Sequence, residues 1–278
     1  MPNTSDRQGH ATKFPHIVCL LCTAFVVVEL SAPLQFLLKP LRKPHFDNTW
    51  DLIVVISFTG SPRESYIKNH LKELQSTKYF FLAGVNGSYL VQHPEDKLWK
   101  SVSPEFLSRY TAGELGCALS HRLAYELVSK SRMKSVLVVE DDAQFTPEFP
   151  SHVQEARASI SDSWRIIHWH TFNRNASEHG RKLINKYLYT ATQPTEFYGT
   201  VCYEINYMSA LELLKETSPV RCGADGPTAM FGVVPFQDYI WLGPGVTQSS
   251  GKPSTINAID QSQGFSRESR NNQSTSKS

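Results

Sequence analysis

Apolar and polar positions divide the chain into short strand-like runs and longer amphipathic stretches. Continuous apolar runs of roughly four to eight residues are typical of buried strands. They predict strands at 51–57, 78–83, 135–140, 164–170, 186–191, 198–205 and 236–242. Apolar residues at helical spacing predict helices over 64–75, 112–130 and 207–217. Because strands alternate with helices, the pattern predicts an α/β domain with a mostly parallel central sheet.

The segments outside this alternation are predicted to be less regular. Asn86 and Gly87 are typical of a turn. Residues 88–108 show neither the helical nor the strand spacing of apolar residues, which predicts irregular structure. From about residue 248 the composition changes to Ser, Gln, Asn and Lys, which is typical of disorder. The predicted organisation is an N-terminal tail, apolar segment and stem over 1–48, a folded domain over 49–256 and a disordered tail over 257–278.

An apolar segment near the N-terminus, residues 14–38, favours membrane association through a single-pass signal-anchor. A cleaved signal peptide and the hydrophobic first helix of a soluble protein are the alternatives. Basic residues just after the segment favour a cytoplasmic location of the folded domain. Glycosylation acceptor sequences at Asn86, Asn175 and Asn272 favour the lumen of the Golgi or endoplasmic reticulum, if the source is eukaryotic.

Composition and charge narrow the class of protein. With 278 residues, 40% of them hydrophobic, the chain can form one sizeable domain. The formal net charge is +2 and there is no dense basic block, so we predict no nucleic-acid partner. Cys117, Cys202 and Cys222 fall in the folded part, where we expect buried thiols rather than a disulfide framework or a structural zinc site.

The predicted helix from residue 112 begins with chemically informative residues. Thr111 and Glu114 have the spacing of a capping box, in which each side chain binds the backbone N–H of the other. Gly113 and Gly116 each cost a helix about 1 kcal/mol relative to alanine, which indicates that some group approaches the backbone closely. A helix N-terminus also attracts anions. The start of this helix is therefore a candidate anion site.

The side chains of this helix divide into two sides, because successive residues are about 100° apart. One side carries leucines that we expect to pack on the sheet: Leu115, Leu119 and Leu123. The other side carries Glu114, Cys117 and His121, and of these Glu114 and His121 would line a cleft. For His121, a purely structural role is the alternative to a role in a site.

Three consecutive acids end the predicted strand at 135–140. Glu140, Asp141 and Asp142 follow four apolar residues, and ligands of open α/β sheets bind just outside the carboxyl ends of the strands. Adjacent carboxylates repel one another unless a positive charge lies among them. A divalent cation that carries a diphosphate would supply it, because hard cations bind carboxylate and phosphate oxygens together. A solvated strand end is the alternative.

The runs at 111–121 and 135–143 resemble those of the family 25 glycosyltransferases, which include bacterial lipooligosaccharide galactosyltransferases and the collagen galactosyltransferases. The order and helix-sized spacing of the two runs carry the resemblance. The tripeptide at 85–87 and the segment at 248–256 are also similar to family motifs. The opening motif differs, because residues 57–63 lack the family's Asn and offer Arg63 as at most a shifted substitute for its paired Arg residues.

Membership of this family would imply a Rossmann-like GT-A fold and a UDP-sugar donor. The resemblance implies that Asp142, with Glu140, holds Mn²⁺ or Mg²⁺. It also implies that Asp141 faces the ribose or the donor sugar. The remaining donor-binding residues are then expected at the helix start: Gly113, Glu114 and Gly116.

A candidate general base follows from the same resemblance. An inverting transfer needs a base that takes the acceptor hydroxyl proton. Asp225 stands near the family's late Asp, and His121 is a second candidate catalytic residue. An ordinary turn residue is the alternative for Asp225, and Asp238 is a weaker candidate base. Trp169 and its two flanking histidines could stack on a sugar, with a place in the core as the alternative for Trp169.

The function that the sequence favours is inverting transfer of a hexose, galactose, from a UDP-sugar to a glycan or hydroxylated acceptor on a glycoprotein or glycolipid. A catalytically inert relative that binds nucleotide sugars or protein partners is the alternative, motivated by the altered opening motif. A nucleotidyltransferase on a similar fold ranks last, because no glycine-rich, lysine-bearing phosphate loop is visible in the sequence.

Overall fold

The computed structural model describes residues 46–171, 183–190, 199–226 and 237–248. The chain divides into two units, residues 1–43 and 44–278, and all the described residues belong to the second. The predicted signal-anchor at 14–38 and the predicted tail at 257–278 lie outside the described residues, as do Asn175 and Asn272. Among the described helices, none is long and apolar enough to cross a membrane.

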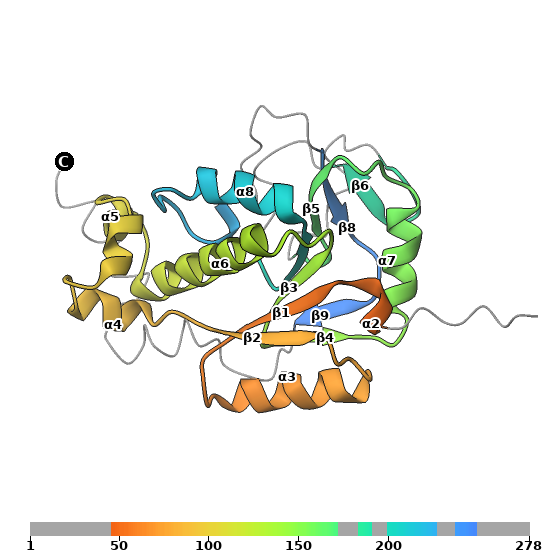
Figure 1. Ribbon diagram of the computed structural model, residues 1–278, viewed down its shortest axis with the longest axis horizontal. Helices are drawn as coiled ribbons and strands as arrows, with labels where there is room; N and C mark the ends of the chain where they lie inside the picture. The colour runs from red at the N-terminus through yellow and green to blue at the C-terminus, as the bar shows by residue number, and fades with distance from the viewer. Residues whose placement is uncertain (1–45, 172–182, 191–198, 227–236, 249–278) are drawn as a thin grey trace, which may run out of the picture. The chain divides into compact units, whose positions relative to one another are not determined.

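A seven-stranded sheet forms the centre of the described domain (Figure 1). Its strands lie in the order β2 (Tyr79–Ala83), β1 (Leu52–Ser57), β3 (Val136–Glu140), β7 (Cys202–Ile205), β5 (Trp164–His168), β8 (Gln237–Trp241) and β6 (Leu188–Thr190). β1 is parallel to β2 and β3, and β5 is parallel to β8. Only β7 and β6 run against the others in this sheet. The predicted α/β fold with a mostly parallel sheet is confirmed.

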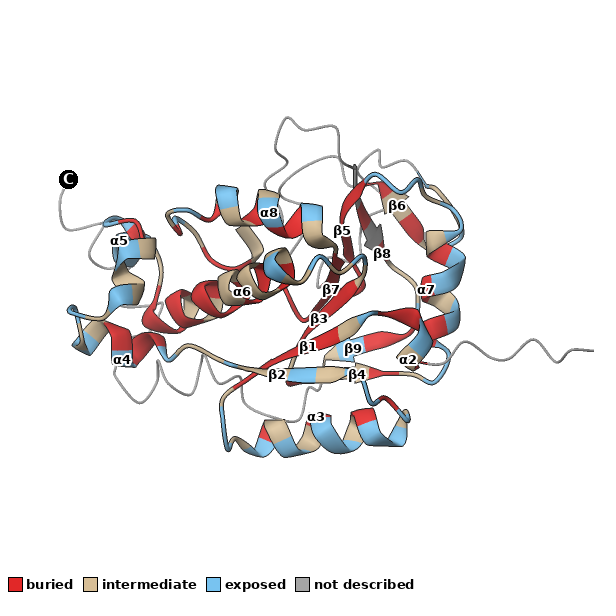
Figure 2. Ribbon diagram, viewed as in Figure 1, coloured by how far each residue is buried: buried red, intermediate tan, exposed pale blue. Residues whose placement is uncertain are grey.

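Helices cover both faces of the sheet (Figure 1). α3 (Pro62–Glu73) and α7 (Phe149–Arg157) share a core with Ile53 and Val55 of β1. α6 (Ala112–Ser131) and α8 (Tyr207–Glu216) share a second core with Val54 and Ile56. Successive side chains of a strand point to opposite faces, so a continuous apolar run marks a strand that is buried on both sides, as the red β1 and β3 in Figure 2 show.

The stretch at 88–108, predicted to be irregular, forms three short helices instead. These are α4 (Gly87–Gln92), the 3-10 helix η2 (Lys97–Ser101) and α5 (Phe106–Arg109). Asn86 caps α4 rather than forming a turn, because its Oδ1 accepts a hydrogen bond from Tyr89 N at 3.0 Å. Helices of one or two turns are too short to show a readable period in the sequence.

The prediction that Leu115 and Leu119 of α6 pack on the sheet is wrong. Leu115 and Leu119 are buried in a cluster with residues of α4 and α5. Ala124, Tyr125 and Val128, in the second half of α6, pack on the sheet instead. An α6 of 20 residues is about 30 Å long, whereas even the six-residue strand β1 spans only about 20 Å. The first half of the helix therefore extends past the sheet (Figure 1).

Besides α7, whose nine residues were not predicted to form a helix, three short elements escape the sequence pattern. They are α2 (Phe46–Thr49) and the strands β4 (Ala143–Phe145) and β9 (Val246–Gln248), which pair antiparallel with each other. A strand of three residues carries too few side chains for a periodic pattern. Gln248, where the composition begins to look disordered, is therefore part of a strand. Its pairing with Ala143 places it beside the acidic run.

The cysteines of the described domain are free thiols, as predicted. Cys202 in β7 is buried, whereas Cys117 and Cys222 are only partly buried. The strand end at 168–170 differs from the sugar-stacking prediction, because all three of its side chains are buried. Trp169 is 1% exposed and its Nε1 donates to Glu204 Oε2 at 3.2 Å. The alternative place of Trp169 in the core is therefore the correct one.

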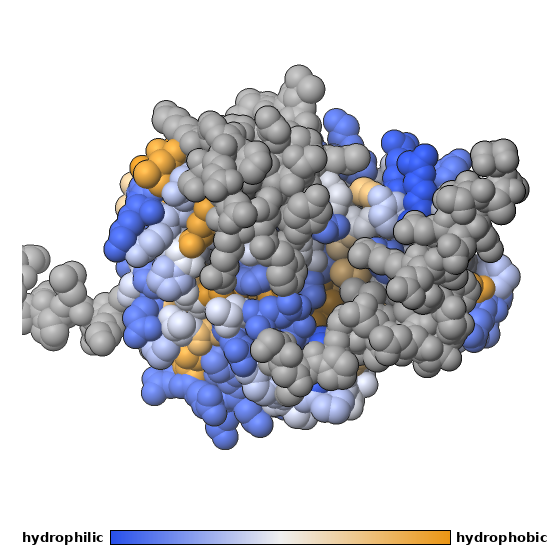
Figure 3. Space-filling model, turned by 180° about the vertical axis from the view of Figure 1, so that it is seen from behind, coloured by the Kyte–Doolittle hydropathy of each residue, from blue (hydrophilic) through white to orange (hydrophobic). Residues whose placement is uncertain are grey.

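The described surface is mostly hydrophilic, with hydrophobic residues interspersed. Large exposed hydrophobic side chains occur on several elements: Phe80, Tyr89, Leu107, Leu183, Met208 and Leu211. Figure 3 shows one face, where blue hydrophilic residues surround small orange hydrophobic areas. Single exposed hydrophobic residues are normal on globular domains.

Gly116 is predicted to tolerate no side chain. A Cβ atom there would lie 2.4 Å from the Val85 carbonyl oxygen and 2.8 Å from Gly87 N, and neither backbone atom can rotate away. We expect Gly116→Ala to lower the free energy of unfolding by about 2 kcal/mol, although alanine is the better helix former. The matched control is Gly84→Ala, where the nearest atoms lie at 3.5 Å and we expect a change within about 0.5 kcal/mol. Urea titrations of both variants measure this, and equal stabilities would contradict the close contact of α4 with α6.

Candidate active site

One cavity gathers the candidate residues. It has a volume of about 420 Å³ and lies where β1, β2 and β3 end and where α6 begins. The eight predicted site residues all line it: Gly113, Glu114, Gly116, His121, Glu140, Asp141, Asp142 and Asp225. Parallel strands bring their carboxyl ends to one edge of a sheet. Because β7 is antiparallel to β3, the residues just before it, Gly199 to Val201, reach the same edge.

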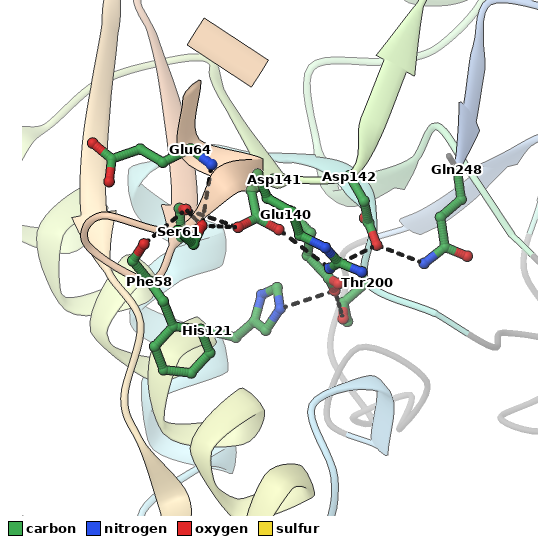
Figure 4. Close-up of polar contacts among 11 residues, drawn as sticks. Phe58, Ser61, Glu64, His121, Glu140, Asp141, Asp142, Thr200 and Gln248 are labelled. Atoms are coloured by element: carbon green, nitrogen blue, oxygen red, sulfur yellow. Dashed lines mark hydrogen bonds and ion pairs between the residues drawn. The ribbon is translucent and has the colours of Figure 1, made fainter. Parts of the chain in front are cut away.

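Arg63 supplies a positive charge among the three acids. Its Nη1 lies 3.4 Å from Asp141 Oδ1 and 3.2 Å from Asp142 Oδ2, and 10% of its side chain is exposed. The residue belongs to the first turn of α3, so the loop after β1 delivers it. Figure 4 shows the contacts that converge on the two aspartates. The chain itself therefore provides part of the charge that the sequence analysis assigned to an external cation.

Asp142 keeps one carboxylate oxygen without a hydrogen bond. Its Oδ2 accepts hydrogen bonds from Arg63 Nη1 and, at 3.0 Å, from Gln248 Nε2 (Figure 4). Its Oδ1 is buried and has no hydrogen-bond partner among the residues that the structure describes. Leaving a buried polar atom without a partner costs free energy. A carboxylate oxygen in this state at a cavity wall is suited to bind a cation.

Asp141 is held by the loop after β1. Ser57 Oγ donates to its Oδ2 at 2.7 Å, and Ser61 Oγ lies 3.5 Å from the same oxygen. Ser61 also caps α3 by accepting a hydrogen bond from Glu64 N at 3.1 Å (Figure 4). Both oxygens of Asp141 therefore have partners in the chain. Its predicted contact with the ribose or donor sugar stays a prediction.

Glu140 contacts α6 and the segment before β7. Its Oε1 accepts a hydrogen bond from Thr200 Oγ1 at 2.6 Å and lies 3.4 Å from His121 Nε2. Figure 4 shows His121 reaching toward it from α6. The other ring nitrogen of His121, Nδ1, lies 2.8 Å from the Tyr203 hydroxyl. Glu140 is thus oriented by two neighbours from different elements.

Burial shifts the pKa values of the acids. It raises the pKa of Asp142 to about 6, and repulsion from Glu140 is the next cause. It also raises the pKa of Asp141. For Glu140 burial acts in the same direction, but the interactions with His121, Thr200 and Arg63 together outweigh it, so its pKa is lowered. An ionised carboxylate beside one with a raised pKa is typical of sites that bind cations or protons.

The raised pKa of Asp142 predicts a loss of stability with rising pH. In an unfolded chain an Asp carboxyl has a pKa of about 3.9. The folded state therefore binds the proton more tightly, and it loses stability as the pH rises from about 4 to about 6. Asp142→Asn carries no such carboxyl. We expect the free energy of unfolding of this variant to exceed that of the wild type by about 3 kcal/mol at about pH 7.5 and to be close to it at about pH 4.

Urea titrations in EDTA at the two pH values measure this difference. EDTA is needed because a cation bound to Asp142 would stabilise only the wild type. A variant that is less stable than the wild type at the higher pH would contradict the raised pKa.

The beginning of α6 has the predicted capping box. Glu114 N donates to Thr111 Oγ1 at 3.2 Å, and Thr111 N donates to Glu114 Oε2 at 2.7 Å. Glu114 thus has a structural role, and it lines the cavity at the same time. The close approach expected at Gly116 is made by the chain itself, through Val85 and Gly87.

Asp225 lies at the cavity in the short segment after α8. A hydrogen bond from Gly226 N to Gly223 O, at 3.0 Å, closes a turn around it. The residue therefore occupies a turn and the cavity wall together, and its role as a base stays a prediction. Asp238 lies in β8, but its side chain falls outside the part of the chain that the structure describes.

Four polar residues that line the cavity were not among the predicted site residues: Ser57, Ser120, Thr200 and Gln248. Ser57 ends β1, so the rule on the carboxyl ends of strands contained a signal for it. Thr200 comes before an antiparallel strand, and Gln248 reaches the cavity through the pairing of β9 with β4. No local pattern announces the contact of Thr200, whereas Gln248 begins the segment that resembles a family motif.

A comparison with families of known proteins identifies the chain. Residues 51–228 match the model of glycosyltransferase family 25 (LPS biosynthesis protein). The chain belongs to glycosyltransferase family 25. The match covers both motif runs and all eight candidate residues, and it confirms the family predicted from those runs.

Relatives of this family 25 protein include two insect proteins and one fish protein. It is 30% identical over 176 residues to a glycosyltransferase 25 family member of Aedes aegypti, which covers 59% of this chain and 28% of the relative. A family member of Anopheles gambiae is 33% identical over 111 residues, and this match covers 38% of this chain and 18% of the relative. Procollagen galactosyltransferase 1 of Danio rerio is 24% identical over 216 residues, and this match covers 75% of this chain and 35% of the relative. The family 25 protein therefore spans about a third or less of these relatives.

A solved structure with some similarity to this family 25 protein is a mannosyltransferase from Pyrobaculum calidifontis in complex with GDP-Man and Mn²⁺. The TM-score is 0.33 at 12% sequence identity, and the match covers 75% of this chain and 61% of that one.

Proposed function

We propose that this protein is an inverting glycosyltransferase that moves a hexose, galactose, from a UDP-sugar to a hydroxyl group of a glycan or hydroxylated acceptor. One observation carries the proposal: the acidic run, the helix start and the late Asp of the family, far apart in sequence, line one cavity. A cavity of about 420 Å³ falls in the range of roughly 300–1,000 Å³ typical of small-molecule sites.

The cavity wall suits a nucleoside diphosphate carried by a divalent cation. Asp142 offers the free buried oxygen Oδ1, which would bind Mn²⁺ or Mg²⁺ with Glu140 as the second ligand. When bound, such a cation supplies charge that neutralises the departing diphosphate. The start of α6, where Gly113 and Gly116 line the cavity, adds the positive end of the helix dipole at the same wall.

The remaining residues are proposed to position groups or to move a proton. Asp225 lines the cavity from a segment separate from the acidic run, and we assign it the role of the base that takes the acceptor hydroxyl proton. His121 contacts Glu140 and would orient its carboxylate. Asp141 would face the ribose or donor sugar while it holds Arg63 in place.

A catalytically inert relative is the second candidate, and Arg63 is the observation that favours it. The guanidinium already lies between Asp141 and Asp142, where a donor-bound cation would otherwise balance their charge. In this alternative the arginine takes the place of the cation, and the cavity binds a ligand without turnover.

We also propose that residues 14–38 associate the protein with a membrane, where glycolipid or glycoprotein acceptors are found. A cytoplasmic location is the alternative. Fractionation of cells that express the full chain, compared with a chain that lacks residues 1–43, tests this. Equal distribution of both chains in the soluble fraction would contradict it.

Thermal unfolding of the full chain with a panel of nucleotide sugars tests the proposed function. We expect one UDP-hexose to raise the unfolding midpoint in Mn²⁺ and not in EDTA. A ligand at 100 times its Kd stabilises the native state by about 2.7 kcal/mol. An acceptor screen with that donor then measures transfer. A raised unfolding midpoint without transfer would favour the inert relative. If no nucleotide sugar raises the midpoint although the protein unfolds cooperatively, donor binding is contradicted.

A further inference from the structure

Cys117, His121 and Glu140 form a cluster that the proposed transfer reaction does not explain. One potential ligand atom from each residue lies within 4.8 Å of the other two: a thiol sulfur, an imidazole nitrogen and a carboxylate oxygen. Cys117 and His121 are about one helical turn apart on α6, and Glu140 ends β3. All three residues line the cavity. The cluster therefore joins two elements at a place that a small ligand can reach.

The imidazole of His121 has an unused nitrogen inside this cluster. The residue is 1% exposed, and its Nδ1 lies 2.8 Å from the Tyr203 hydroxyl. Its Nε2 is buried, makes no hydrogen bond to any described residue and lies 3.4 Å from Glu140 Oε1. When Nδ1 donates to the tyrosine, Nε2 carries its lone pair into the cluster. Histidine binds metals in this form.

The surroundings of the other two groups also suit a bound metal. Thr200 Oγ1 donates to Glu140 Oε1 at 2.6 Å and so orients the carboxylate, as neighbouring hydrogen bonds do for metal ligands. Cys117 is a free thiol.

We propose that Cys117, His121 and Glu140 bind a divalent transition metal of the zinc class. Tetrahedral zinc has bonds of about 2.0 Å to nitrogen or oxygen and about 2.3 Å to sulfur, so its ligand atoms lie roughly 3.3–3.8 Å apart. The separation of 3.4 Å between His121 Nε2 and Glu140 Oε1 fits this geometry. The longest separation in the cluster, within 4.8 Å, needs a closure of about 1 Å.

The donor atoms decide the class of metal. A thiolate and an imidazole favour zinc-class ions over Mg²⁺ and Mn²⁺, which prefer oxygen ligands. With three protein ligands, the fourth position faces the cavity and is open to water or to a ligand group.

This site shares Glu140 with the cation site proposed for the sugar donor but uses different partners. The donor's cation would bind Asp142 Oδ1 and the diphosphate, whereas the zinc-class ion binds on the side of α6. The inference holds whether or not the protein transfers a sugar. An ion pair between protonated His121 and Glu140 is the alternative, and it requires nothing of Cys117.

Titration of the full chain with Co²⁺ tests the proposal, because a cobalt–thiolate bond gives a near-ultraviolet absorption band that oxygen and nitrogen ligands alone do not give. Cys19 and Cys22 are replaced by serine throughout, since two closely spaced thiols could bind cobalt themselves. We expect one equivalent of Co²⁺ to produce the band, Zn²⁺ to abolish it and Mg²⁺ to leave it. Cys117→Ser should abolish the band, and the matched control Cys222→Ser should retain it.

Two further measurements keep the test independent of any one variant. We expect His121→Gln to weaken cobalt binding at least about ten-fold. With Cys117 and Cys222 both present, Zn²⁺ should slow alkylation of Cys117 by iodoacetamide but not that of Cys222, as peptide mass spectrometry measures. Three results would each overturn the proposal and leave the His121–Glu140 ion pair: no band at one equivalent, a band that survives Cys117→Ser, or alkylation that Zn²⁺ does not change.

Discussion

Asp142→Asn is expected to reduce the rate of sugar transfer by at least about 100-fold, the loss typical when one electrostatic contact to a developing charge is removed. Asp142 carries the free buried oxygen at the cavity wall, and an amide in its place has no negative charge with which to bind a cation. The amide keeps the shape of the side chain and can still accept the hydrogen bond from Gln248. Initial rates with the UDP-hexose identified by thermal unfolding, at saturating Mn²⁺, measure the loss.

Asp162→Asn is the matched control for this experiment. Asp162 is exposed and does not line the cavity, so the same chemical change should leave transfer unchanged. The stability gain expected for Asp142→Asn at neutral pH separates the two roles of the residue. A residue needed only for folding would lose stability and activity together. Full activity in Asp142→Asn would remove the basis of the proposed donor site.

Arg63→Met is expected to lower the free energy of unfolding by about 3 kcal/mol at about pH 7.5, because removal of one partner leaves buried charges without compensation. Arg63 contacts Asp141 and Asp142, which are 5% and 3% exposed. Without the guanidinium the pKa values of both carboxyls rise further. At about pH 4 a larger share of both carboxyls is then protonated than at about pH 7.5, so we expect the deficit in the free energy of unfolding to shrink. Urea titrations at the two pH values measure the difference.

Arg122→Met and Arg63→Lys are the controls. Arg122 pairs with Glu126 along α6, and both side chains are partly exposed. Solvent screens such a pair, so we expect a loss of about 0.5 kcal/mol or less. Arg63→Lys should fall between the two, since lysine keeps the charge without the fork of donors. Equal losses for the two methionine variants would contradict the role of Arg63 as the counter-charge of the acids.

Arg63→Met also discriminates between the transferase and the inert relative. If the arginine takes the place of a cation, its removal should create or strengthen Mn²⁺-dependent binding of the UDP-sugar. If the wild type already binds donor and Mn²⁺ together, the same substitution should weaken donor binding. Thermal unfolding with and without Mn²⁺ measures both cases.

The sequence by itself determined the strands of the central sheet, three of its helices and eight of the residues that line the cavity. Each of the seven predicted strands is present, and the helix predicted over 112–130 is α6, Ala112–Ser131. Period and apolar content are local properties, so they can be read without knowledge of the fold. The rule on strand ends likewise placed Glu140 at the ligand-binding edge, and the spacing of Thr111 and Glu114 predicted their capping box.

Only the tertiary structure decided which of these residues meet. Arg63 lies 78 positions before Asp141, and Gln248 lies 106 positions after Asp142, yet both contact the acidic run. The burial of Leu115 against α4 and α5, and the short helices themselves, also depend on packing rather than on a local period. Contacts across a sheet follow from the order, direction and register of the strands. Spacing along the chain does not encode these, which is why the counter-charge of the acids and the Cys117 cluster emerged only from the fold.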